Sequence, residues 1–127
     1  MMETAAPTVL VVDDEPQVVW MLRLSLEAEG YQTLSARDGR SALDEVRRHR
    51  PELMLLDIMM PVMDGWSVLE ELQTLPASER PRVVVVSARA SLRDRAKAVE
   101  LGADAFVPKP FNIDDLLRVV HDLKKAS

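Results

Sequence analysis

Short apolar runs alternate with amphipathic stretches along the whole chain. The apolar runs hold roughly four or five residues and the amphipathic stretches roughly ten to fifteen. This alternation is typical of βαβ units, so it predicts an α/β fold in which helices flank a five-stranded parallel sheet. We expect strands at about 8–12, 32–36, 52–56, 82–86 and 103–107, and helices at about 15–29, 39–49, 64–75, 92–101 and 112–124.

Several residues mark the expected ends of these elements. The run at 32–36 mixes polar and apolar residues, which favours an edge strand, because strands covered on both faces are apolar throughout. Proline suits the first turn of a helix, glycine suits the position after its end, and serine or asparagine suits the N-cap. The residues that fit these roles are Pro16, Gly30, Gly102, Ser91 and Asn112.

Length and composition favour one domain in a reducing compartment. A chain of 127 residues, 47% of them hydrophobic, can build one core. We expect residues 1–7 to be a flexible tail and residues 8–127 to form the domain. The chain has no cysteine, no signal-like start and no membrane-length apolar run, which favours the cytoplasm and no membrane contact. A net charge of −5 argues against direct binding of nucleic acid.

Residues that can handle metal or phosphate come directly after the apolar runs. Asp13 and Asp14 follow the first run, Asp57 follows the third, Ser87 follows the fourth, and Lys109 comes two residues after the fifth. The carboxyl ends of parallel strands meet at the edge of an open sheet where ligands bind. We therefore expect these five side chains to lie close together.

The residue types at this edge predict phosphoryl transfer. Three carboxylates in one place repel each other unless a cation compensates, and an all-oxygen ligand set favours Mg²⁺. The backbone carbonyl of Met59 could add a further metal ligand. Asp57 could then act as a nucleophile that accepts a phosphoryl group, while Lys109 and the Ser87 hydroxyl stabilise its oxygens.

Four segments of the chain together resemble one known family. Their order and their places at strand ends are similar to the receiver domain of bacterial two-component response regulators, over roughly residues 8 to 124. The segments are Val11-Val12-Asp13-Asp14-Glu15-Pro16, Leu56-Asp57-Ile58-Met59-Met60-Pro61-Val62-Met63-Asp64-Gly65, Val86-Ser87-Ala88 and Lys109-Pro110-Phe111.

The resemblance implies a flavodoxin-like, doubly wound sheet of strand order 2-1-3-4-5 with five helices. It also implies a phosphoacceptor, not an enzyme acting on a separate substrate, that takes a phosphoryl group on Asp57 from a histidine kinase or histidine phosphotransfer protein. An unidentified downstream protein would bind the face built from the fourth helix, fifth strand and fifth helix, and a phosphorylation-dependent homodimer is left open. In this resemblance Asp13, Asp14 and Met59 bind metal, Ser87 and Phe106 form the switch, and Lys109 binds phosphate.

Three positions depart from common patterns in the family. Position 106 is Phe where many members have Tyr, so a rotating aromatic would lack a hydroxyl. Met59 and Arg89 occupy the positions two residues past the phosphoacceptor and two past the switch hydroxyl. The resemblance implies that these side chains hinder the approach of water and lengthen the phosphorylated lifetime. The Lys109-Pro110 bond could be cis or trans.

Other interpretations stay open. Each acid could be a helix cap or turn residue, Ser87 a local cap, Lys109 a surface charge and Phe106 plain core. A phosphatase of the haloacid dehalogenase type would need an acid where Met59 stands. A pseudo-receiver, or the receiver part of a longer DNA-binding or cyclase regulator, is a further alternative. We expect Trp20 and Trp66 to be partly buried, His49 and His121 to be surface residues, and Arg89, Arg93, Arg95 and Lys97 to form a solvated face with Asp94.

Overall fold

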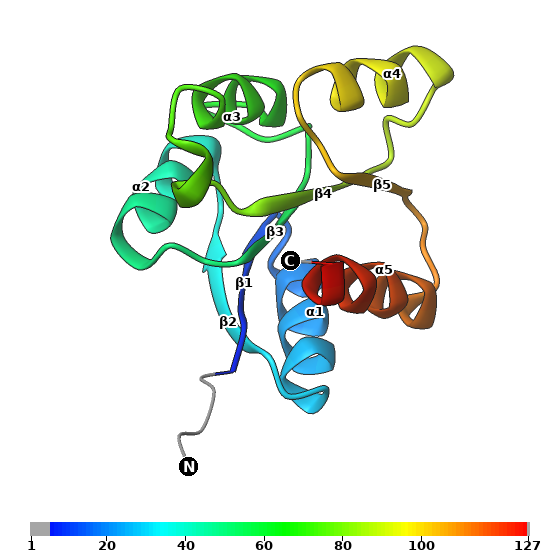
Figure 1. Ribbon diagram of the computed structural model, residues 1–127. Coiled ribbons are helices and arrows are strands. Elements are labelled where there is room, and N and C mark those ends of the chain that lie inside the picture. Colours follow the sequence, from blue (N-terminus) through cyan, green and yellow to red (C-terminus); the bar gives the residue numbers. More distant parts are fainter. Residues whose placement is uncertain (1–5, 127) are drawn as a thin grey trace.

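The chain forms five strands, each followed by a helix, in a computed structural model that describes residues 6–126 (Figure 1). Of the expected tail, residues 1–5 lie outside the described part. The strands are β1 (Thr8–Val12), β2 (Gln32–Ala36), β3 (Leu53–Leu56), β4 (Arg82–Ser87) and β5 (Ala105–Pro108). The helices are α1 (Pro16–Ala28), α2 (Gly39–His49), α3 (Gly65–Leu72), α4 (Leu92–Glu100) and α5 (Ile113–Ala126), with a short 3₁₀ helix at Ala77–Glu79.

All four strand pairings are parallel, in the order β2-β1-β3-β4-β5, which confirms the expected fold. Helices α1 and α5 cover one face of the sheet, and α2, α3 and α4 cover the other (Figure 1). Successive strand residues point to opposite faces. In β1, Leu10 and Val12 therefore join the core under α2 and α3, while Val9 and Val11 join the core under α1 and α5.

The helix ends follow the local sequence. Ser91 caps α4 in a reciprocal capping box with Asp94, and Pro16 occupies the first turn of α1, as expected. Gly30 and Gly102 have φ angles of 96° and 102°, a left-handed conformation that glycine adopts at little cost. Two further caps were not predicted: Asp38 accepts a hydrogen bond from the Ser41 N–H at the start of α2, and Asp64 accepts one from the Ser67 N–H at the start of α3.

Three boundaries differ from the prediction by two or three residues: the end of α3, the start of β5 and the end of α5, which lies at Ala126 instead of 124. Helix α3 ends at Leu72 instead of 75, because the Arg80 guanidinium binds the carbonyl oxygens of Gln73 and Leu75 at 3.0 and 2.8 Å. Strand β5 begins at Ala105 instead of 103, because the N–H of Ala103 donates to the Ala98 carbonyl and closes α4. Within residues 6–126, no helix is both long enough and apolar enough to cross a membrane.

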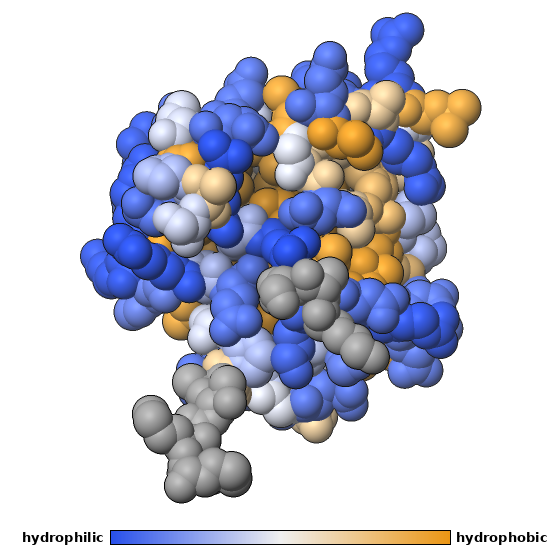
Figure 2. Space-filling model, in the orientation of Figure 1, coloured by the Kyte–Doolittle hydropathy of each residue, from blue (hydrophilic) through white to orange (hydrophobic). Residues whose placement is uncertain are grey.

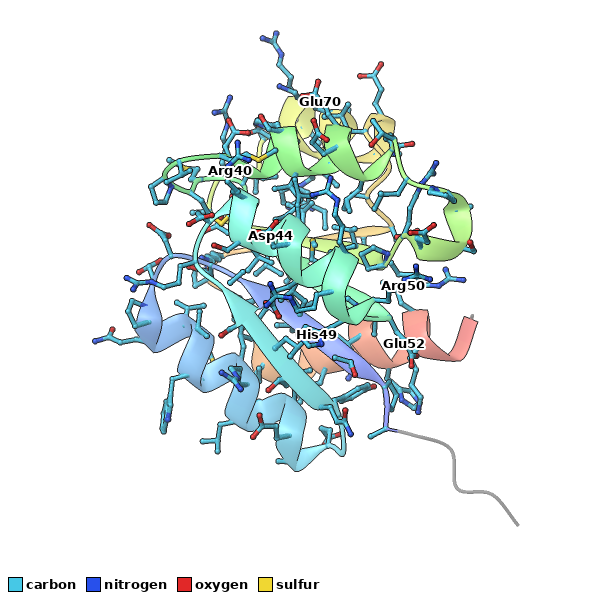
Figure 3. The ribbon with its side chains drawn as sticks, turned by 90° about the vertical axis from the view of Figure 1, so that its left-hand side faces the viewer. Arg40, Asp44, His49, Arg50, Glu52 and Glu70 are labelled. Atoms are coloured by element: carbon cyan, nitrogen blue, oxygen red, sulfur yellow. The ribbon has the colours of Figure 1, made fainter. Side chains whose placement is uncertain are left out.

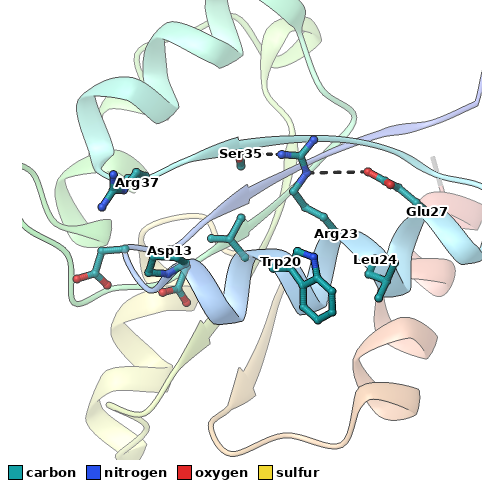
Figure 4. Close-up of a pocket in the computed structure, with 10 residues that line it drawn as sticks. Asp13, Trp20, Arg23, Leu24, Glu27, Ser35 and Arg37 are labelled. Carbon is teal, nitrogen blue, oxygen red and sulfur yellow. Dashed lines mark hydrogen bonds and ion pairs between the residues drawn. The ribbon is translucent and has the colours of Figure 1, made fainter.

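The interpretation of Trp20 as partly buried is wrong. Its side chain is 67% exposed beside Leu24, at a groove of about 430 Å³ between α1 and the edge strand β2 (Figure 4). In this groove the Arg23 guanidinium donates a hydrogen bond from α1 to the Ser35 hydroxyl of β2, and it forms an ion pair with Glu27 one turn further along α1. The other tryptophan, Trp66, is buried more completely than expected.

The two histidines lie on the surface, as expected. Figure 3 shows Arg40, Asp44 and His49 along the outward face of α2. His49 Nε2 lies 3.7 Å from the carboxylate of Glu45, one helical turn earlier. His121 is exposed on α5.

Candidate functional site

Two buried carboxylates end adjacent strands of the sheet. Asp13 follows β1 and Asp57 follows β3, and their residues are only 3% and 6% exposed. Sheet-like hydrogen bonds hold both backbones, because the Asp13 N–H donates to the Ala36 carbonyl at 3.1 Å and the Asp57 N–H donates to the Val12 carbonyl at 3.0 Å. The register of β1, β2 and β3 therefore fixes the backbone positions of Asp13 and Asp57.

Lys109 joins these carboxylates. Its ammonium nitrogen lies 2.8 Å from Oδ2 of Asp13 and 3.2 Å from Oδ2 of Asp57, and 3.8 Å from a carboxylate oxygen of Glu15. The lysine side chain is only 15% exposed. The interpretation of Lys109 as a solvated surface charge is therefore wrong. Glu15 was not predicted, although its place directly after the two aspartates could have indicated it.

The surroundings of Asp57 disfavour its charge. Burial raises the pKa of Asp57; Lys109 opposes this rise, and the negative charge of Asp13 adds to it. The result is a pKa above the ordinary value. For Lys109, burial alone would lower the pKa, but the hydrogen bond to Asp13 and the charge of Asp57 outweigh burial and raise it. Both shifts show a poorly solvated site in which one ammonium serves several carboxylates.

Ser87 and Met59 complete the edge of the site. Ser87 is fully buried at the end of β4, and its hydroxyl oxygen accepts a hydrogen bond from the Arg89 N–H at 3.1 Å. The Met59 N–H donates to Oδ1 of Asp57 at 3.2 Å, while the Met59 side chain is 59% exposed. The Lys109 N–H donates to the Ser87 carbonyl, and the Lys109-Pro110 bond, which the sequence left open, is cis.

The residues at this edge fit a hard divalent cation. One carboxylate oxygen each from Asp13, Asp14 and Asp57 lies within 4.8 Å of the other two. One ammonium, that of Lys109, pairs with two of these three carboxylates, and Glu15 adds a fourth carboxylate 3.8 Å from it, so acidic groups outnumber basic ones at this edge. An all-oxygen set with this charge suits Mg²⁺, which commonly takes one or two carboxylates together with phosphate oxygens and water.

The interpretation of Asp13 as a cap of α1 is wrong, because the N-cap residue is Glu15 and no side chain among the described residues caps this helix, but Asp13 does order the turn before it. Its Oδ1 accepts a hydrogen bond from the Glu15 N–H at 2.9 Å, directly before α1 begins. The other oxygen, Oδ2, is the one that binds Lys109. One carboxylate thus orders the chain before α1 with one oxygen and faces the site with the other.

The basic cluster is largely the solvated face that the sequence predicted, because three of its four members are exposed and Arg95 is half-buried. The Arg95 guanidinium lies 5.2 Å from the centre of the Phe106 ring, and the Lys97 ammonium lies 4.5 Å from that of Trp66. Phe106 is half-buried and packs against the core under α4. Arg89 pairs with Asp94, which is only 8% exposed, because that acid is part of the α4 capping box.

Comparison with known proteins gives one family. Residues 9–121 match the model of the response regulator receiver domain. The chain is 36% identical over 120 residues to the response regulator GtcR of Aneurinibacillus migulanus, covering 94% of this chain and 48% of that protein. It is 41% identical over 112 residues to the transcriptional regulatory protein KdpE of Mycobacterium tuberculosis, covering 86% and 47%. The chain thus spans about half the length of the curated relatives it matches.

Solved structures agree with this result. The receiver domain of the Francisella response regulator 1452 superposes with a TM-score of 0.88 at 32% identity, covering 94% of this chain and 98% of that one. A CheY-like receiver domain protein from Methanospirillum hungatei gives a TM-score of 0.85 at 30% identity, with 94% and 95% covered. Fold, strand-end acids and sequence agree, and the chain belongs to the family of response regulator receiver domains.

Proposed function

We propose that this receiver domain accepts a phosphoryl group on Asp57 from a phosphohistidine of a histidine kinase or histidine phosphotransfer protein. The observation that carries the proposal is the Lys109 ammonium, which lies within 3.2 Å of both buried carboxylates, Asp13 and Asp57. A family member that had lost this activity would have no need of such a costly arrangement of buried charge. The pseudo-receiver alternative therefore has little support.

In the proposed reaction an Asp57 carboxylate oxygen attacks phosphorus in line with the leaving nitrogen. The new O–P bond forms as the P–N bond of the phosphohistidine breaks, and the bonding electrons leave with the imidazole. Mg²⁺ bound by Asp13, Asp14, Asp57 and the Met59 carbonyl would neutralise charge on the phosphoryl oxygens. The Lys109 ammonium would bind one of these oxygens, and the Ser87 hydroxyl would turn toward another and donate to it.

The output surface in this proposal is the face formed by α4, β5 and α5. Figure 2 shows hydrophobic surface between α4 and α5 on the side that Figure 1 presents. On α4, Leu92 and Val99 are 86% and 67% exposed, which is unusual for large apolar side chains and typical of a binding surface. Movement of Ser87 toward the phosphoryl group would free space for Phe106 and change this face. A cytoplasmic location goes with this family.

Intact mass after incubation with acetyl phosphate and Mg²⁺ tests the phosphoacceptor. We expect a gain of about one phosphoryl group per chain, and no gain without Mg²⁺. The variant Asp57→Asn should show no gain. The matched control is Asp38→Asn, which also removes one carboxylate but leaves a residue that caps a helix equally well.

Two results would overturn the proposal. An equal gain in Asp57→Asn would show that another residue is the acceptor. No Mg²⁺-dependent gain with acetyl phosphate, phosphoramidate or a panel of phosphorylated histidine kinases would show that the chain is not a phosphoacceptor at all.

A further inference from the structure

Arg89 lies beside the site but is paired away from it. Its side chain shares a hollow of about 450 Å³ with Asp14 and Met59, so the site lies within reach of the guanidinium. The guanidinium Nε nevertheless donates to Oδ1 of Asp94 on α4, at 3.0 Å. The backbone N–H of the same arginine donates to the Ser87 hydroxyl oxygen. Arg89 thus connects the switch hydroxyl to the first turn of α4.

Asp94 is itself held in place by the cap of that helix. Its Oδ2 accepts hydrogen bonds from the Ser91 hydroxyl at 2.8 Å and from the Ser91 N–H at 3.2 Å, which leaves Oδ1 for Arg89. The carboxylate therefore has a fixed position and a fixed charge. The arginine is 55% exposed and rotates about four side-chain bonds, so it is the member of the pair that can move.

We propose that Asp94 is a positioning residue that keeps Arg89 out of the metal and phosphoryl site, and that a phosphoryl group on Asp57 competes with Asp94 for this arginine. The inference rests on the proposed function and adds a residue outside the site that controls it. Without Asp94, the acids that share a hollow with Arg89 are Asp64, at the start of α3, and Asp14, which belongs to the group of three carboxylates at the strand ends and so offers the larger negative charge. Arg89 would then turn toward these three carboxylates and oppose a bound cation.

The competition also gives the site a connection to α4. A phosphoryl group on Asp57 carries nearly two negative charges and three strong acceptor oxygens, in place of the single charge of the carboxylate. Arginine binds such a group through paired N–H donors better than it binds a single carboxylate oxygen. Transfer of Arg89 would leave the Asp94 carboxylate without its cation and loosen the first turn of the helix that carries Leu92, at the proposed output face.

The first test needs neither metal nor phosphate. In a ¹⁵N-labelled, metal-free chain, the Arg89 Nε–H signal should be unaffected by Asp57→Asn, because Arg89 pairs with Asp94. In the Asp94→Asn background, adding Asp57→Asn should shift that signal, because the arginine has moved to the site. An Arg89 signal that ignores Asp57→Asn in both backgrounds would overturn the proposal.

The second test is calorimetric titration with Mg²⁺ alone. We expect Asp94→Asn to weaken Mg²⁺ binding by roughly three- to tenfold, which is the effect of one added cation a few ångströms away when solvent partly screens it. Adding Arg89→Gln to Asp94→Asn should restore the parental affinity. The matched control is Asp115→Asn, which removes an ion-paired acid at the equivalent position of α5.

The outcomes separate the two proposals. If the double variant stays as weak as Asp94→Asn, Asp94 acts only through the structure of α4 and the inference is wrong. If the parent binds no Mg²⁺ but the Arg89 signal responds as expected, the positioning role of Asp94 holds and the proposed metal site fails. Far-UV circular dichroism of each variant shows whether α4 and the rest of the fold are intact.

Discussion

Replacing Asp57 by Asn should stabilise the metal-free chain, although it removes the proposed phosphoacceptor. The reason is the burial of the Asp57 charge, to which the crowding of carboxylates at the strand ends adds. Asp57 is only 6% exposed, its pKa is raised by burial, and it shares one ammonium with Asp13. A neutral amide of nearly the same shape keeps the hydrogen bond from the Met59 N–H and loses the repulsion.

The structure gives the magnitude. The three carboxylate oxygens lie within 4.8 Å of one another, so each of two repulsions costs Asp57 at least about 3.5 kcal/mol at an effective dielectric constant of about 20. The two repulsions together cost about 7 kcal/mol, and attraction to Lys109 at 3.2 Å offsets about 5 kcal/mol of this cost. The remainder is about 2 kcal/mol, so we expect Asp57→Asn to raise the free energy of unfolding by about 1–2 kcal/mol at pH 7.

The effect should depend on pH with a definite sign. Because the folded-state pKa of Asp57 lies above the ordinary value of 3.8, the folded parent binds this proton more tightly than the unfolded chain does. The parent therefore loses stability as the pH rises from 3.8 through the folded-state pKa. The advantage of Asp57→Asn is complete above that pKa and fades as the pH falls toward 3.8.

Urea unfolding followed by circular dichroism, with a chelator and with Mg²⁺, measures both effects. In Mg²⁺ at about 100 times its dissociation constant, we expect the free energy of unfolding to rise by about 2.7 kcal/mol for the parent alone. The parent should then be more stable than Asp57→Asn, which reverses their order in chelator. Asp38→Asn is the control and should change neither value. Lower stability of Asp57→Asn than of the parent in chelator at pH 7 would refute the charge-crowding argument.

Three further outcomes are expected. Ser91→Ala should lower the free energy of unfolding by about 1 kcal/mol in urea because the α4 cap is lost, whereas Ser91→Asn should change it little. Gly65→Ala would place a Cβ 2.6 Å from the Asp57 carbonyl oxygen. It should therefore cost about 1–3 kcal/mol in the same assay, and equal stability would contradict the close approach. Lys109→Met leaves the buried Asp13 and Asp57 without a cation. We expect a loss of about 3 kcal/mol in chelator that Mg²⁺ largely restores; a loss unchanged by Mg²⁺ would count against the metal site.

The sequence predicted the parts of the molecule that depend on strand register. Asp13 and Asp57 directly follow apolar strands and Ser87 is the last residue of another, so parallel pairing brings all three to one edge by aligning the ends of β1, β3 and β4. No side-chain conformation enters that argument. The predicted meeting of these side chains at the carboxyl ends therefore does not change when the first residue of a strand is misplaced by one or two positions, as it was for β5.

Features that depend on side-chain direction were not predictable in the same way. Val18, Val19, Trp20, Met21 and Leu22 are consecutive apolar residues in α1, so periodicity could not show which of them faces water. The structure exposes Trp20 and buries Leu22. The pairing of Arg89 with Asp94 depends likewise on one choice of side-chain rotation, and the shared ammonium of Lys109 depends on a loop whose cis bond the sequence left open.

The salt bridge between Lys109 and Asp13 joins residues 96 positions apart, near the two ends of the chain. Ribosomal synthesis therefore produces the carboxylates of β1 and β3 well before the lysine that neutralises them. A chain released before β5, or nicked so that β5 is lost, keeps the acids but lacks their cation, and the repulsion calculated above then opposes its folding. The uncompensated charges thus add to the loss of a strand in opposing the folding of a domain that lacks β5.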